Sequence, residues 1–163
     1  MNNHNIKRIM FVLLIIHVSL FICKNSYTDT INFKGINNSF LINLAYRKDR
    51  LEHFKQKYTQ ANIHIPLHIH TAVNGKELKL EDIHITRLAK KEINDAQTLG
   101  YRTKHYQLTM GGIGCYLSHV GLWNFIYNKG IDYALIFEDD ASIPPDFIEN
   151  LNISIKNMNK ADP

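Results

Sequence analysis

Three consecutive carboxylates, Glu138-Asp139-Asp140, are the residues whose types and spacing point most directly to chemistry. They follow the apolar run Tyr133–Phe137, which is typical of a strand buried on both faces of a parallel sheet. In open α/β sheets, ligands bind beyond the carboxyl ends of such strands. Adjacent anions repel one another unless a cation offsets their charge, and hard divalent ions take oxygen ligands. The triplet therefore indicates a metal site, with a solvated acidic turn as the alternative.

A glycine-rich segment, Thr109–His119, is the second candidate. Its glycines permit close approach to a ligand, and exposed N–H groups at the start of the following helix attract anions. The segment lacks the Gly-Lys-Ser/Thr of a P-loop and the third glycine of a dinucleotide fingerprint. Ser118 and His119 are adjacent on a helix, so their side chains diverge by about 100° and a hydrolase triad is rejected. The two residues either contact a ligand or stabilise the helix start.

Two arginines, Arg47 and Arg50, stand where the loop after the apolar segment Phe40–Leu44 meets a helix N-terminus. This position favours binding of anions. The alternative interpretation is a solvated helix start, in which the arginines pair with Asp49 and Glu52.

The turn Asn74-Gly75 ends a second strand, whose end is expected beside that of the first strand and hence near the same cleft. Three histidines, His64, His68 and His70, lie in or near that second strand. Their spacing suggests zinc, but no fourth ligand stands out, and plain strand histidines are the favoured interpretation.

Strands and helices alternate along the chain, which predicts an α/β fold with a parallel sheet. The expected strands are Phe40–Leu44, Leu67–Val73 and 133–137, and the expected helices begin near Arg50, Thr86, Cys115 and Asp146. Thr86 is the expected N-cap of the second helix, and Gly100 and Gly130 are the expected stops of the second and third. The residues expected to face the core are Leu51, Phe54, Tyr58, Ala61, Leu88, Ile93, Ala96, Leu122, Trp123, Ile126, Tyr127, Phe147, Ile148, Leu151 and Ile155.

Composition narrows the class of protein. The chain has 163 residues, is 45% hydrophobic and 21% charged, and is therefore expected to fold into one globular domain with an appendage. Its net charge of +4 is spread along the chain without a basic block, so no nucleic-acid partner is expected. With only Cys23 and Cys115, a disulfide framework is excluded.

The N-terminal segment has the pattern of a secretory signal. Lys7 and Arg8 precede the apolar run Ile9–Cys23, and we favour an uncleaved single-pass anchor over a cleaved signal peptide. A buried core strand or helix is the alternative. The protein is thus expected in the membrane or the secretory pathway (the ER or Golgi lumen in a eukaryote). The acceptor sequons at Asn37 and Asn152 are compatible with a lumenal domain.

The order of these motifs resembles glycosyltransferase family 25, which includes lipooligosaccharide glycosyltransferases and collagen galactosyltransferases. The resemblance is carried by 40–44 with Arg47 and Arg50, by 71–75, by 114–119 with Trp123, and by 135–140 with Asp146-Phe147. Gly112 stands where the family usually has Glu. The chain ends near the point where family members continue into further strands and acceptor-binding segments.

The resemblance implies a GT-A-like (Rossmann-like), mostly parallel sheet flanked by helices and incomplete at its C-terminus. It also implies inverting transfer of a hexose, galactose first, from a nucleotide-sugar donor such as a UDP-hexose to a hydroxyl of a glycan or glycoprotein. The cofactor would be Mn²⁺ or Mg²⁺, held by Glu138 and Asp140. The implied donor-binding residues are Arg47, Arg50, Asn74, Gly75, Ser118, His119 and Asp139. No residue is assigned as the general base.

Three regions are expected: a signal or anchor with the start of a stem at 1–30, a linker at 31–38, and the donor-binding part of a family 25 domain at 39–163. Two other functions compete with sugar transfer. One is a truncated, non-catalytic relative that binds a nucleotide sugar or a partner protein. The other is a secreted structural or adhesion module that binds Ca²⁺ through the acidic triplet.

Overall fold

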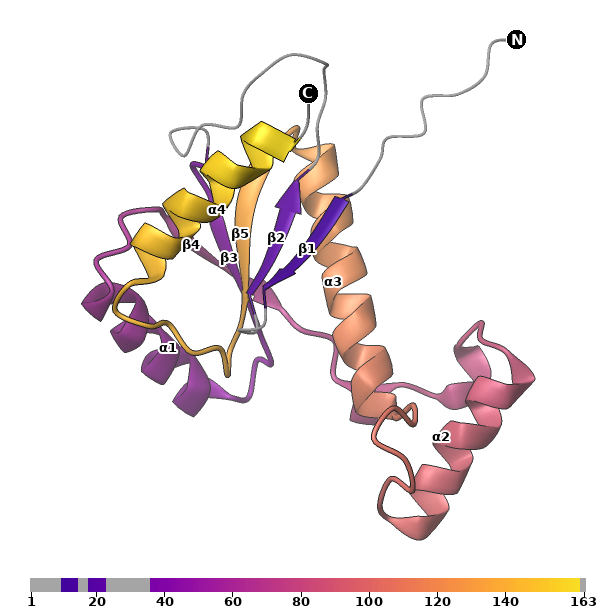
Figure 1. The fold of residues 1–163 in the computed structure, drawn as a ribbon. Coiled ribbons are helices and arrows are strands. Elements are labelled where there is room, and N and C mark those ends of the chain that lie inside the picture. Colours follow the sequence, from indigo (N-terminus) through magenta and orange to yellow (C-terminus); the bar gives the residue numbers. More distant parts are fainter. Residues whose placement is uncertain (1–9, 15–17, 23–35, 162–163) are drawn as a thin grey trace, which may run out of the picture.

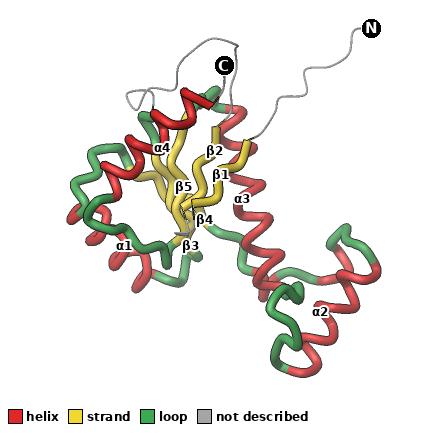
Figure 2. The backbone as a smooth tube through the Cα atoms, viewed as in Figure 1, coloured by secondary structure: helices red, strands yellow, loops and turns green. Residues whose placement is uncertain are grey.

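The computed structural model describes residues 10–14, 18–22 and 36–161. Their elements, in chain order, are β1 (Met10–Leu14), β2 (Val18–Ile22), β3 (Ser39–Asn43), α1 (Lys48–Gln60), β4 (Leu67–Thr71), the short 3₁₀ helices η2 (Gly75–Glu77) and η3 (Leu80–Asp82), α2 (Arg87–Leu99), α3 (Met110–Asn128), β5 (Tyr133–Glu138) and α4 (Phe147–Ala161). Figure 1 shows one central sheet between helices, and Figure 2 separates the strands in the middle from the helices around them.

The sheet has the strand order β1-β2-β5-β3-β4. Strand β3 pairs in parallel with both β4 and β5, while β2 is antiparallel to β5 and β1 to β2. In the register, Ile42 lies opposite His70 on one side and Glu138 on the other. The carboxyl ends of β3, β4 and β5 therefore meet at one edge. This confirms the predicted α/β class and is consistent with the GT-A-like arrangement.

One face of the sheet packs on α1 and α4. Leu41 of β3 and Leu135 and Phe137 of β5 point to this side, because side chains alternate along a strand. The ring of Phe137 lies 5.3 Å from that of Phe54 and 5.8 Å from that of Phe147, so both helices share one aromatic contact. This core fixes the end of β5 relative to the start of α1.

The other face of the sheet packs on α3. Phe40 and Ile42 of β3 alternate with Leu41 and meet Leu122 and Ile126 of the helix. Ala134 and Ile136 of β5 complete this cluster, all of it buried. Strands β3 and β5 are thus covered on both sides, which explains their continuous apolar sequences.

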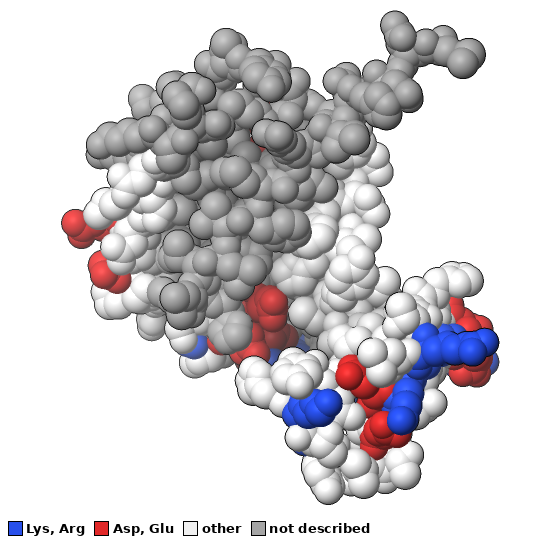
Figure 3. Space-filling view, turned by 45° about the vertical axis from the view of Figure 1, so that its right-hand side comes forward, with Lys and Arg blue, Asp and Glu red and all other residues white. Residues whose placement is uncertain are grey.

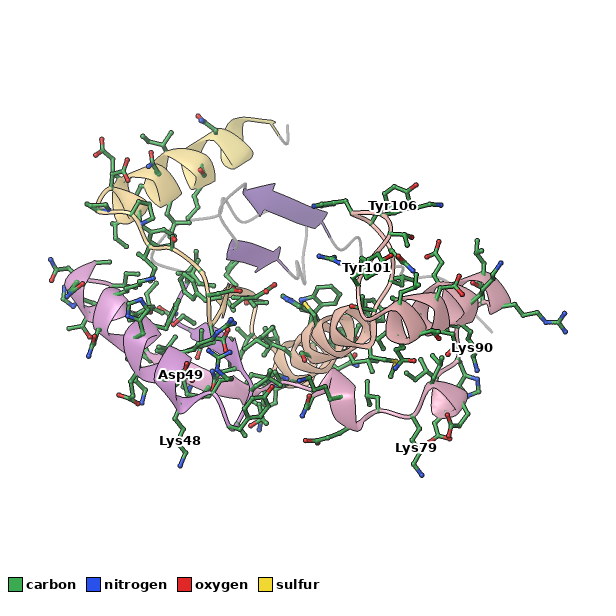
Figure 4. The ribbon with its side chains drawn as sticks, turned by 90° about the horizontal axis from the view of Figure 1, so that it is seen from below. Lys48, Asp49, Lys79, Lys90, Tyr101 and Tyr106 are labelled. Atoms are coloured by element: carbon green, nitrogen blue, oxygen red, sulfur yellow. The ribbon has the colours of Figure 1, made fainter. Side chains whose placement is uncertain are left out.

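The helix α2 and the loops beside it form a lobe that projects past the sheet next to the start of α3 (Figure 1). Its small core contains Ile93 of α2 and Met110 and Ile113 of α3. Figure 4 shows Tyr101 and Tyr106 on the loop between α2 and α3, and both side chains are exposed. In Figure 3, Lys and Arg side chains alternate with acidic ones over this lobe, typical of a solvated surface.

Most predicted core residues and helix ends are confirmed. Thr86 caps α2 by accepting a hydrogen bond from the N–H of Ala89, and Gly100 and Gly130 both have positive φ after their helices. Two core assignments are wrong: Leu88 and Tyr127 are 67% and 51% exposed. The apolar face that packs on the core is narrower on both helices than predicted.

The third helix starts at Met110, earlier than the predicted Cys115. Thr109 is its N-cap and accepts a hydrogen bond from the N–H of Gly112 at 3.1 Å. The glycine-rich segment is therefore the first turns of a helix, and its cap and tertiary contacts offset the low helix propensity of glycine.

The N-terminal apolar run has no helix in its described part. Met10–Leu14 and Val18–Ile22 pair as an antiparallel hairpin on β5, as in the alternative of a core strand rather than an anchor helix. The rest of the run, including Ile9 and Cys23, and most of the predicted linker lie outside the described residues. Among the described residues, no helix combines the length and hydropathy needed to cross a membrane.

Candidate active site: the cleft at the carboxyl ends of β3, β4 and β5

A cleft of about 230 Å³ opens where the three parallel strands end. The connection after β4, the first turns of α3 and the last residue of β5 with the turn after it form its walls. Among the side chains and backbone groups that line it are those of Asn74, Gly75, Cys115, Ser118, Glu138 and Asp139. In Figure 3, acidic atoms are exposed where the body of the sheet meets the α2 lobe. The segments predicted to converge on one cleft do so.

The carboxylate of Asp139 is the most buried of the acidic triplet, with a side chain only 10% exposed. Arg50 donates to its Oδ1 at 2.9 Å, and the side-chain amide of Asn43 donates to its Oδ2 at 2.8 Å. Charge-assisted hydrogen bonds of this length are strong and directional. Asp139 is therefore held in place by α1 and β3.

The carboxylate of Asp140 is the most accessible of the triplet. Its side chain is 53% exposed, and Oδ2 lies 3.6 Å from the nearer guanidinium nitrogen of Arg50. This distance is long for a hydrogen bond and leaves an ion pair screened by solvent. Asp140 thus offers its oxygens to solvent at the end of β5.

Glu138 turns toward α3. Its Oε1 lies 3.1 Å from Nε2 of His119 and 4.0 Å from the sulfur of Cys115. The ligand atoms of these three residues all lie within 4.8 Å of one another. Hydrogen bonding to Cys115, and then to Glu138, raises the pKa of His119 to about 9 against the effect of burial. At neutral pH, His119 is consequently a buried imidazolium paired with a carboxylate.

Ser118 is used structurally. Its hydroxyl donates to the carbonyl of Gly114 at 2.6 Å and accepts from the N–H of Val73 at 2.8 Å. The second bond ties α3 to the end of β4. Of the two interpretations of Ser118, the structure supports stabilisation of the helix.

The turn Asn74-Gly75 is likewise held by the protein. The side chain of Asn74 accepts from the N–H of Lys76 and donates to Glu77, which caps η2. At Gly75 any Cβ would overlap the carbonyl of Met110, because the turn lies directly against the start of α3. Asn74 and Gly75 therefore shape the wall of the cleft.

Unlike Arg50, Arg47 directs its guanidinium to the first turn of its own helix. It makes two hydrogen bonds to the carboxylate of Asp49, at 2.9 and 2.7 Å, and these lower the pKa of Asp49 to about 2. Figure 4 places Asp49 at the first turn of α1. For Arg47 the structure shows the alternative of a solvated helix start, whereas Arg50 reaches the acidic triplet.

Comparisons with known proteins identify the family of this chain. The model of glycosyltransferase family 25, described as an LPS biosynthesis protein family, matches residues 36–162. The chain belongs to glycosyltransferase family 25. It is 31% identical to human procollagen galactosyltransferase 2 over 129 residues, and 32% identical to a Drosophila melanogaster glycosyltransferase 25 family member over 130 residues. Each alignment covers 78% of this chain and 19% of the relative, so the chain spans about a fifth of the length of these relatives.

The residues of this family 25 chain fit a hard divalent ion. Arg50 and Asn43 hold the two oxygens of Asp139, and Glu138 and Asp140 bring two further carboxylates to the end of β5, that of Glu138 being paired with His119. Mg²⁺ and Mn²⁺ are usually held by one or two carboxylates together with substrate phosphate oxygens, which matches this sparse set.

The zinc interpretation of the three histidines is not supported. Within the described residues, the ligand atoms of His64, His68 and His70 do not form a close group. The ring of His68 packs 5.3 Å from that of Phe40, and burial lowers the pKa of His70. The three residues are therefore interpreted as ordinary strand and loop histidines, the interpretation favoured from the sequence.

Sequence reasoning missed four residues of this family 25 site. Asn43 holds Asp139, while Tyr46, Lys76 and Cys115 line the cleft. Asn43 and Tyr46 follow the core of the first strand, and Cys115 stands in the glycine-rich motif, so their positions were a usable signal. Lys76 carries no such signal, because a lysine after a turn is ordinary in sequence.

The Arg50–Asp139 pair gives a first prediction. Arg50→Ala is expected to lower the free energy of unfolding by about 1–2 kcal/mol, because the largely buried carboxylate of Asp139 loses a charge-assisted partner that is itself partly exposed. Arg47→Ala is the matched control, since among the described residues Arg47 forms its ion pair with the exposed carboxylate of Asp49. Urea denaturation of both variants measures the difference, and equal losses would contradict the assigned role of Arg50.

Proposed function

We propose that this chain binds a nucleotide-sugar donor, with UDP-galactose as the first candidate. It would transfer the hexose, with inversion, to a hydroxyl of a glycan or glycoprotein. The cleft at the carboxyl ends of three parallel strands, with Glu138 and Asp139 in its wall, carries the proposal. The choice of galactose rests on the human relative, whose name describes a procollagen galactosyltransferase.

The residues around the cleft suit a sugar diphosphate. Lys76 lines the wall and brings a positive charge close to where a diphosphate would lie, and Tyr46 offers an exposed ring on which a uracil base can stack. The rigid turn Asn74-Gly75 shapes the space between them. These groups bind and orient the donor before transfer.

A divalent ion on Glu138 and Asp140 would neutralise the negative charge that develops on the departing diphosphate. The chain itself supplies the placement of these carboxylates. Arg50 and Asn43 fix Asp139, which sits between them in sequence, and His119 fixes the side chain of Glu138. Asp140 is left accessible from solvent for the donor complex.

Calorimetric titration of the full chain with UDP-galactose tests the proposal. Binding is expected with Mn²⁺ or Mg²⁺ present and is expected to weaken strongly after the ion is removed with EDTA. Release of UDP in the presence of an acceptor would then establish transfer. No binding of any UDP-sugar with Mn²⁺ present would overturn the proposal.

Two other outcomes would identify the competing functions. Donor binding without hydrolysis or transfer would identify a non-catalytic nucleotide-sugar-binding relative. A protein that Ca²⁺ stabilises through Asp139 and Asp140, and that binds no UDP-sugar, would be a calcium-dependent module.

We also propose that the protein is attached to a membrane or enters the secretory pathway through its N-terminal segment. The support is the basic pair Lys7 and Arg8 before the apolar run, together with the exposed sequon residue Asn37. Use of the run as an anchor would require β1 and β2 to leave the sheet. Alkaline carbonate extraction is expected to leave the chain in the membrane pellet if the segment is an uncleaved anchor. A full-length, unglycosylated chain in the soluble fraction would contradict both forms of the proposal.

A further inference from the structure

Cys115, His119 and Glu138 bring a thiol, an imidazole and a carboxylate to one point beside the cleft. The Nε2 of His119 and the sulfur of Cys115 lie 3.1 and 4.0 Å from the same carboxylate oxygen of Glu138. Three different ligand types this close together are what a small transition-metal ion uses in proteins.

The spacing is near that of a zinc site. Metal–ligand bonds of about 2.0–2.3 Å in a tetrahedron correspond to ligand–ligand distances of about 3.3–3.7 Å. The two distances to the carboxylate oxygen bracket this range, and the third pair, the sulfur of Cys115 and the ring nitrogen of His119, lies within 4.8 Å.

The three ligands come from rigid elements. Cys115 and His119 are one turn apart on α3, and residues four apart share a helix face. The helix is tied to the end of β4 through Ser118 and Val73, and Glu138 ends a strand buried on both faces. Such support preorganises a metal site.

We propose that Cys115, His119 and Glu138 form a binding site for a thiophilic divalent cation, with Zn²⁺ preferred, that borders the donor cleft. Thiolate and imidazole ligands select Zn²⁺ over Mg²⁺, Mn²⁺ and Ca²⁺, which prefer oxygen, and binding would release the protons of the Cys115 thiol and of the His119 imidazolium to solvent. Cys115 and Glu138 both line the cleft, so a fourth ligand, water or a substrate oxygen, has access from that side.

This site is distinct from the hard-ion site of the proposed function but shares Glu138 with it. The two ions therefore compete for one carboxylate, and Zn²⁺ is expected to weaken binding of a donor that needs Mn²⁺. Without an ion, the three side chains would serve only to orient Glu138 through the His119 ion pair.

Titration of the metal-free full chain with Co²⁺, as a spectroscopic substitute for Zn²⁺, tests the site without any donor. We expect a thiolate-to-cobalt charge-transfer band and intense tetrahedral d–d bands, both removed by one equivalent of Zn²⁺ and unaffected by excess Mg²⁺. Cys115→Ser should abolish the charge-transfer band and weaken Zn²⁺ binding at least about tenfold. Loss of a residue that only hydrogen-bonds to a metal ligand already weakens metal binding by about this factor, and loss of a ligand itself should weaken it at least as much. Cys23→Ser, which removes the other thiol of the chain, is the matched control and should leave both unchanged.

A measurement on the unaltered protein covers the case in which Cys115→Ser does not fold. Zn²⁺ is expected to slow alkylation of Cys115 by iodoacetamide, followed by mass spectrometry of the peptides, and to leave the rate at Cys23 unchanged. The proposal would be overturned if the charge-transfer band were absent, or if only Cys23→Ser abolished it. It would also be overturned if Zn²⁺ did not slow alkylation of Cys115. None of these results depends on whether the chain binds a nucleotide sugar.

Discussion

Asp140→Asn is expected to lower the rate of sugar transfer by about 10²–10³-fold, the usual effect of removing one preorganised charge-stabilising group. The substitution keeps the size of the side chain and removes its negative charge at the end of β5. Because the side chain of Asp140 is half exposed and lies 3.6 Å from the guanidinium of Arg50, the free energy of unfolding should change little. Transfer to a glycan acceptor at saturating Mn²⁺, with urea denaturation alongside, measures both quantities.

Two variants separate this effect from a general loss of charge. Asp132→Asn removes an exposed carboxylate just before the opposite end of β5 and should leave transfer unchanged. Asp139→Asn removes the carboxylate that Arg50 and Asn43 hold, and should lower the stability as well as the rate. Full activity in Asp140→Asn would show that this carboxylate takes no part in binding the donor or its ion.

The convergence of the cleft could be predicted from the sequence because it follows from parallel pairing alone. Strands joined through helices in an α/β fold run parallel, so their carboxyl ends lie at one edge of the sheet. The placement of Asn74-Gly75 beside Glu138 needed no knowledge of side chains. The site's location is a property of topology.

The different roles of the three adjacent carboxylates could not be predicted in this way. Asp139 is held by Arg50 and Asn43, which lie 89 and 96 residues earlier in the chain. Glu138 is turned to α3 by His119. Asp139 is thus buried, Asp140 is exposed to solvent, and Glu138 faces α3, although the three residues are adjacent in sequence. Only the tertiary packing decides which of the three takes which environment.

The glycine-rich segment shows a second limit of sequence reasoning. Low helix propensity and three glycines favoured a loop that approaches a ligand, but the segment is helical from Met110 onward. The reason lies in a contact across the chain. Gly114 and Gly75 lie against each other, so the close approach that glycine permits is between α3 and the turn after β4. The close approach that the structure shows is to the protein's own backbone, and approach to a ligand stays a prediction.

That contact leads to the second prediction of large effect. Gly114→Ala is expected to lower the free energy of unfolding by about 2–3 kcal/mol, a typical cost of overpacking a well-packed contact. A Cβ at this position would lie 2.7 Å from both the N–H nitrogen of Gly75 and the carbonyl oxygen of Val73, and backbone atoms cannot turn aside as side chains do. Relief requires α3 to move away from β4, which would also stretch the bond from Val73 to Ser118 and widen the cleft.

Gly112→Ala is the matched control, two residues earlier in the same helix. A Cβ there would meet only the hydroxyl of Thr109, at an ordinary contact distance of 3.6 Å, and alanine favours a helix over glycine by up to about 1 kcal/mol. The two substitutions add the same methyl group and should therefore change stability in opposite directions in thermal or urea denaturation. If Gly114→Ala were neutral or stabilising, α3 would not be held against the turn Asn74-Gly75, and the wall of the cleft would have to be formed differently.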